Sequence, residues 1–135
     1  MTKHFKVKEF NQPASHGLPA EDYPASWVQD RLLPLCQALE IIRAALGKPI
    51  HITSGYRSPA YNKAIGGAPK SQHMLGFASD LVVEGVDAKI VHDTILQLHK
   101  QGRIKIGGLG AYPNFTHVDI RVGKKLARWK GSRNS

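Results

Sequence analysis

The sequence predicts an α+β fold, a small antiparallel sheet with helices packed on one side of it. Three observations support this class. Apolar residues recur every three or four positions between residues 32 and 46, which is the spacing of one helix face. The segment 116–122 alternates apolar and polar residues, as a half-buried strand does. Helical and strand patterns do not alternate regularly along the chain, which disfavours a parallel sheet with crossover helices.

Residues 1–25 contain three prolines and one glycine and are expected to form an N-terminal arm packed on the domain. The next segment predicts a helix that is capped by Ser26, kinked or divided early by Pro34 and ended by Gly47 and Pro49, because glycine readily adopts the left-handed conformation of a helix end. The core-facing stripe of this helix consists of Leu32, Leu35, Cys36, Leu39, Ile42 and Leu46.

The remaining patterns predict strands at 51–53, 78–83 and 116–122 and helices at 59–65 and 87–100. Ser58 is expected to cap the first of these helices and Asp87 the second. Residues 104–112 are rich in glycine, which indicates a strand or loop approached closely by another segment. Five of the last twelve residues are Lys or Arg, so the basic tail 124–135 is expected to be partly mobile.

The composition is that of one ordinary globular domain covering residues 1–135. The chain is 41% hydrophobic and 21% charged, and its length suffices for a single core without disulfide bonds. No apolar run is long enough to span a membrane. Residues 1–10 lack the apolar segment of a secretory signal, so synthesis in the cytoplasm is expected. Cys36 is expected to be a buried, inert thiol.

His73 and Asp80 combine an imidazole and a carboxylate in a loop that runs into a strand. Such ligands suit zinc, which takes only three protein ligands in catalytic sites. The third candidate is His117, in the alternating strand. Taken singly, each of these residues is more often an ordinary loop, cap or packing residue. Together they predict a single zinc site in a cleft on the sheet, with the fourth position open for hydrolytic chemistry.

Around these residues the sequence resembles the zinc peptidases of bacterial cell walls. The resemblance runs from about Phe5 to Trp129 and rests on four motifs in the family's order, at residues 52–59, 71–80, 110–113 and 117–119. The family includes D-Ala-D-Ala carboxypeptidases and L-Ala-D-Glu endopeptidases, many of them phage endolysins. Its metal-site fold is shared with the hedgehog signalling domain.

The resemblance implies roles for residues around the metal. Arg57 is expected to hold a carboxylate of the substrate through its planar, two-pronged guanidinium. Ser71 and Gln72 either contact the substrate or hold the loop. Tyr112 and Trp129 either line the cleft or pack in the core.

Asp119 lies two residues after His117 and therefore on the same face of the strand. It is expected to be the general base, although a role in orienting His117 or in binding the metal stays open. In much of the family a Glu three positions before the last ligand, or a His two before it, serves as the base. Those positions here are Asn114 and Phe115, neither of which accepts a proton usefully.

The resemblance implies a zinc metallopeptidase that hydrolyses the stem peptide of peptidoglycan, most simply an endolysin-type L-Ala-D-Glu endopeptidase. Alternatives are a D-Ala-D-Ala carboxypeptidase, a D,D-endopeptidase, or a non-catalytic zinc-binding protein that recognises the cell wall. An enzyme of this kind reaches the periplasm or wall after release, for example through a holin pore.

The net charge of +9 fits attraction to a polyanion, and an anionic wall polymer explains it simply. Nucleic-acid binding is not expected, because basic and aromatic residues are not interleaved and no helix clusters residues able to read bases. A monomer is the default for a chain of this size.

Overall fold

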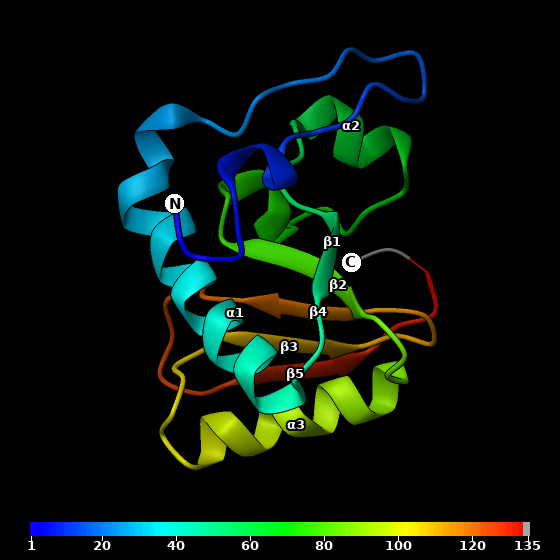
Figure 1. Cartoon of the computed structure of the whole chain (residues 1–135). Coiled ribbons are helices and arrows are strands. Elements are labelled where there is room, and N and C mark those ends of the chain that lie inside the picture. Colours follow the sequence, from blue (N-terminus) through cyan, green and yellow to red (C-terminus); the bar gives the residue numbers. More distant parts are fainter. Residues whose placement is uncertain (134–135) are drawn as a thin grey trace.

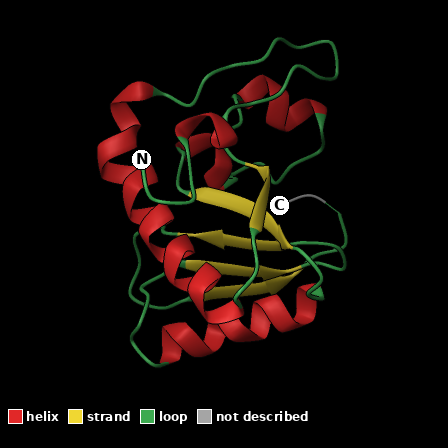
Figure 2. Ribbon diagram, in the orientation of Figure 1, coloured by secondary structure: helices red, strands yellow, loops and turns green. Residues whose placement is uncertain are grey.

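The computed structural model describes residues 1–133, whose strands form one five-stranded sheet in the order β1-β2-β4-β3-β5 (Figures 1 and 2). The strands are β1 (Ile50–Ser54), β2 (Ala78–Val83), β3 (Gly108–Ala111), β4 (Thr116–Asp119) and β5 (Ala127–Lys130). Neighbouring strands are antiparallel except β3 and β5, which run parallel. The α+β class is confirmed, with a mixed rather than purely antiparallel sheet.

Three α-helices accompany the sheet: α1 (Leu33–Leu46), α2 (Pro59–Ala64) and α3 (Ala88–Lys100). Short 3-10 turns occupy Val7–Phe10, Ala25–Trp27 and Gln72–Leu75, and a π turn covers Val28–Leu32. The first long helix was expected to start at Ser26. Pro34 divides this stretch as expected, because proline has no N–H to continue the regular hydrogen-bond ladder, and the α-helix itself begins only at Leu33.

The predicted helix ends are largely confirmed. Gly47 ends α1 in the left-handed conformation, with φ of 66°. The Ser58 hydroxyl accepts a hydrogen bond from the Tyr61 amide at 3.2 Å and so caps α2. Asp87 precedes α3 as predicted, but its side chain makes no capping bond. No helix within residues 1–133 has the length and apolar character that crossing a bilayer requires.

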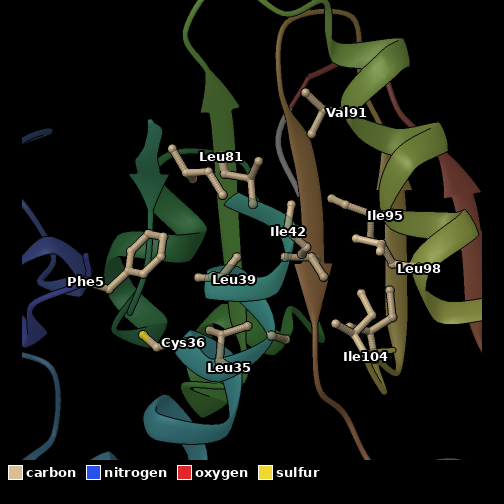
Figure 3. Close-up of a cluster of buried hydrophobic side chains, with 14 of the residues drawn as sticks. Phe5, Leu35, Cys36, Leu39, Ile42, Leu81, Val91, Ile95, Leu98 and Ile104 are labelled. Carbon is tan, nitrogen blue, oxygen red and sulfur yellow. The ribbon is translucent and has the colours of Figure 1, made fainter. Parts of the chain in front are cut away.

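The hydrophobic core lies where α1 and α3 pack against one face of the sheet (Figure 3). Its members from the strands are Ile50, Leu81, Val83, Leu109 and Val118. The predicted stripe of α1 is buried except for Leu46, which is only partly covered. Each fully buried leucine favours folding by about 1.5–3 kcal/mol. Burial also raises the pKa of the Cys36 thiol to about 12, which fits the predicted inert cysteine.

The N-terminal arm packs on the domain as predicted. Phe5 and Phe10 insert into the core. Gln12, also buried, accepts a hydrogen bond from the Ser58 amide at 2.7 Å and donates one to the Pro19 carbonyl at 3.0 Å. The arm is therefore fixed beside the start of α2.

Near the C-terminus the structure shortens one predicted strand and contains another that the sequence did not predict. The strand expected at 116–122 ends at Asp119, because the next pair in register is only half bonded: the Ile120 amide donates to the Phe77 carbonyl, but the Phe77 amide donates to the Gln72 carbonyl. Val122 is 95% exposed instead of lying in the core. The tail expected to be partly mobile contains β5, which is held by hydrogen bonds to β3. Positions 134–135 of the predicted tail lie outside the described residues.

Candidate metal centre

The face of the sheet opposite α1 and α3 carries the candidate site. Asp80 of β2 is the direct partner of His117 on β4, and His117 is in turn the partner of Gly110 on β3. Because directly paired residues point to the same face, the carboxylate and imidazole lie side by side. The sheet register thus joins two candidate ligands that are 37 positions apart in sequence.

His73 completes the cluster from the short helical turn Gln72–Leu75, which precedes β2. Asp80 Oδ1 lies 3.1 Å from His73 Nε2 and 3.2 Å from His117 Nδ1. One ligand atom from each residue falls within 4.8 Å of the others, and all three side chains are buried. The structure therefore brings together the three predicted ligands, His73, Asp80 and His117, in a set that suits zinc.

Each histidine is also held by a hydrogen bond at the ring nitrogen that does not face Asp80. His73 Nδ1 lies 2.7 Å from the Gly55 carbonyl oxygen and donates to it, which leaves Nε2 for a metal. His117 Nε2 lies 2.7 Å from Asp119 Oδ2, which leaves Nδ1 on the Asp80 side. Such outer hydrogen bonds fix ring orientation in metal sites, so both rings fit a bound zinc ion.

The electrostatics favour an ionised carboxylate at the centre. Burial opposes the charge on Asp80, but His73 and His117 lower its pKa overall. Burial lowers the pKa of His73, which keeps its nitrogen available as a ligand. Burial acts in the same direction on His117, yet hydrogen bonds to Asp119 and Asp80 raise its pKa overall. Asp80 thus supplies the negative charge that a divalent cation requires.

Arg57 lies inside the protein beside this cluster, with only 2% of its surface exposed. Its Nη2 donates to Asp80 Oδ2 at 3.2 Å, its Nη1 to Asn62 Oδ1 at 3.1 Å and its Nε to Ser54 Oγ at 3.0 Å. Burial lowers the pKa of this guanidinium, and Asp80 partly offsets the effect. The guanidinium holds the carboxylate oxygen that faces away from the two histidines.

Asp119 is surrounded by hydrogen-bond donors. Its Oδ1 accepts from the Arg121 amide at 3.0 Å and from Arg121 Nε at 2.9 Å, and its Oδ2 accepts from Arg121 Nη2 at 2.6 Å as well as bonding His117. Burial would raise the pKa of Asp119, but these partners lower it to about 2. A carboxylate held in this way is a weak proton acceptor.

Two glycines of β3 make room for the site, which confirms the close approach expected at residues 104–112. A Cβ at Gly108 would overlap the Asp119 carboxylate, and a Cβ at Gly110 would lie 2.7 Å from the Trp129 indole. Trp129 of β5 therefore reaches over Gly110 to His117, with the two ring centroids 4.9 Å apart. The Trp129 Nε1 donates to the Tyr112 hydroxyl at 2.9 Å.

A cavity of about 600 Å³ opens beside His117. Four residues were expected to contact substrate, and three of them line this cavity: Ser71, Gln72 and Tyr112. The fourth, Arg57, does not. Trp129 also lines it, so this aromatic borders the cleft. Ser71 has a structural task as well, because its hydroxyl accepts from the His73 amide at 3.2 Å. Arg57 and Asp80 line a second cavity of about 390 Å³.

A family model described as Peptidase M15 matches residues 3–119 of the chain. The chain belongs to this family. The peptidoglycan L,D-endopeptidase MepK of Escherichia coli is 33% identical over 107 residues, which cover 73% of this chain and 56% of the relative. The zinc D-Ala-D-Ala carboxypeptidase of Streptomyces albus G is 48% identical over 44 residues, which cover 32% of this chain and 17% of the relative. The chain thus spans little more than half of MepK.

Within this Peptidase M15 chain, Arg121 is a site residue to which the sequence assigned no role of its own. The available signal was its position on the alternating strand, two residues after Asp119. The other histidines, for which no role was predicted, lie outside the three-residue cluster; they are His4, His16, His51, His92 and His99.

Proposed function

We propose that this chain is a zinc-dependent peptidase that cleaves the peptide part of peptidoglycan at a bond between an L and a D residue. The observation that carries the proposal is the buried His73-Asp80-His117 cluster, set between two cavities. The larger cavity has room for a short peptide segment, and a site with three protein ligands leaves a position free for hydrolysis.

Zinc bound here would act as a Lewis acid toward the scissile carbonyl and would activate water. The protein's own part is to hold the ligands. The Gly55 carbonyl oxygen accepts a hydrogen bond from His73 and fixes its ring, and Arg57 donates to the Asp80 oxygen that faces away from the histidines. Ser71 caps the turn that carries His73. These contacts keep the three ligand atoms converged with little rearrangement on binding.

We also propose that Asp119 positions His117 and does not serve as the general base. Both of its oxygens already accept hydrogen bonds from Arg121, and one of them also bonds His117 Nε2. Its low pKa leaves little basicity for taking a proton from water. Arg121 then has a supporting role, because it sets the orientation of the Asp119 carboxylate.

The similarity to an L,D-endopeptidase supports an internal L–D bond as the target. The L-Ala-D-Glu bond expected from the sequence belongs to that class. The Streptomyces relative favours a second candidate, removal of a terminal D-Ala, although it matches a shorter part of the chain. We further propose that the protein reaches the wall by an endolysin-type route through a holin pore. Its net charge of +9 would then attach it to anionic wall polymers.

Mass spectrometry of soluble products tests the proposal. Purified protein is incubated with peptidoglycan, with a chelator, and with zinc restored after the chelator. Fragments that need zinc and carry a new L carboxyl end and a new D amino end support the L,D-endopeptidase. Zinc-dependent release of free D-Ala supports the carboxypeptidase. Failure to release any fragment from several wall types, while zinc still binds, overturns both and favours a non-catalytic zinc-binding protein.

A further inference from the structure

Two cavities lie on either side of the metal cluster. His117 lines the larger cavity, whereas Asp80 lines the smaller one. These two residues are direct partners on neighbouring strands, and their facing atoms are 3.2 Å apart. A peptide with its scissile bond at the metal would therefore place one segment in each cavity.

The larger cavity is lined by aromatic and by basic side chains. Tyr112 and Trp129 supply aromatic surface, and Lys70, Arg121 and Lys130 supply positive charge. No Asp or Glu is among the eleven residues that line it. A ligand with a partly aliphatic body and a negative charge matches this lining.

The three cations are not equivalent. Arg121 is already paired with Asp119, and its Nη2 lies 2.6 Å from that carboxylate. Lys70 and Lys130 are exposed, and within residues 1–133 neither forms an ion pair. Their ammonium groups are therefore available to an incoming anion at the cavity rim.

We infer that Lys70 and Lys130 bind a free carboxylate on the substrate segment that occupies the larger cavity. The inference rests on the proposed peptidase function and narrows its substrate to an anionic peptide. Arg57 borders the smaller cavity and is occupied by Asp80, so recognition of this carboxylate falls to the two lysines. A charge-assisted contact of this kind makes amidation of the carboxylate unfavourable for binding.

Stem peptides in matched pairs test the inference. The members of one pair differ only in whether the α-carboxylate of D-Glu is free or a carboxamide. The members of the other pair differ in the same way at the diaminopimelate carboxylate. Wild-type protein is expected to favour the free acid of at least one pair by about tenfold in kcat/KM. The double variant Lys70→Gln/Lys130→Gln is expected to lose that preference, so that its kcat/KM values for the acid and the amide become equal.

A control variant separates local recognition from general charge. Lys48→Gln/Lys100→Gln removes the same two charges from exposed positions outside the cavity and is expected to keep the preference. Binding of the same peptides to zinc-loaded protein, measured by calorimetry, scores the preference independently of turnover. The inference is overturned when both variants respond alike, or when wild-type protein does not distinguish acid from amide. Carboxylate preference in binding without any zinc-dependent cleavage would count against the proposed function alone.

Discussion

The face of the sheet that packs against α1 and α3 is built from aliphatic side chains, whereas the opposite face buries charged and ionisable ones. Leu81 and Asp80 are neighbours in β2 and show the contrast directly, because both are buried but on opposite faces. The same alternation separates Val118 from His117 on β4.

The two kinds of burial have opposite energetic signs. Removing an aliphatic side chain from water favours folding without any partner. Burying a charge is costly unless it is paired and hydrogen-bonded, and a buried ion pair seldom stabilises more than apolar residues of the same shape. The Arg57–Asp80 pair therefore adds little to the free energy of folding, but it holds the Asp80 carboxylate in position as a ligand. The core face is expected to determine stability and the opposite face to determine metal binding.

Replacement of Asp80 by alanine gives the largest expected effect. It removes the negatively charged ligand and leaves the buried Arg57 guanidinium without this partner. Zinc-dependent activity is expected to fall by at least about 10³-fold, and the zinc-free protein to lose about 3–5 kcal/mol of unfolding free energy. Zinc titration and urea unfolding measure the two effects. Unchanged zinc affinity would remove Asp80 from the ligand set.

Leu39→Ala tests the other face. Leu39 is fully buried in α1 and lies away from the metal cluster. The variant is expected to lose about 2–5 kcal/mol of unfolding free energy, since the cavity it leaves cannot fully collapse. Its zinc dissociation constant is expected to remain that of the wild type. A large change in zinc affinity would mean that the two faces are coupled through the sheet and do not have separate roles.

Asp119→Asn separates positioning from base catalysis. The amide keeps the size of the side chain but weakens the hydrogen bond that orients His117. Loss of such an outer contact is expected to lower zinc affinity or activity by about 10–100-fold. In the positioning role, the pH dependence of kcat keeps its wild-type shape. Disappearance of an acidic limb from the profile would instead identify Asp119 as the base.

Periodicity predicted most of the fold because it reports burial. The stripe from Leu32 to Ile42 is apolar, and those positions are buried. The predicted β2, 78–83, agrees with the observed Ala78–Val83. The division of the helical stretch at Pro34 was also predictable, because the missing N–H is a local property.

The strand in the tail was not predicted, because it depends on a partner that is distant in the sequence. Lys and Arg in β5 give it the composition of a solvated segment, yet its backbone pairs with β3 about twenty residues earlier. The motif order predicted the three candidate ligands. It did not predict that the Arg57 side chain would be buried. Only the folded chain brings this side chain against Asn62 and Asp80, so its burial has no signature in the local sequence.

The smallest effect concerns a hydrogen-bonded carboxylate at the protein surface, which contrasts with the buried pair of Arg57 and Asp80. Glu40 on α1 accepts hydrogen bonds from the His4 amide and from His4 Nδ1, both at 2.7 Å. Burial opposes the charge on Glu40, but these bonds together lower its pKa overall. Its stabilising contribution is therefore present above the pKa of the unfolded chain and is lost as the pH falls through the folded value.

Glu40→Gln is accordingly expected to lower the unfolding free energy by less than about 1 kcal/mol at neutral pH, because solvent screens the pair. The difference from wild type should vanish in acid, where the carboxylate is protonated in both states. Glu84→Gln is the matched control, since its contact with His51 is 3.9 Å long and more exposed, and no change is expected. Urea unfolding of both variants between neutral and acidic pH makes the comparison. A pH-independent loss in Glu40→Gln would assign the effect to packing on α1, because only the ionised carboxylate gives the predicted pH dependence.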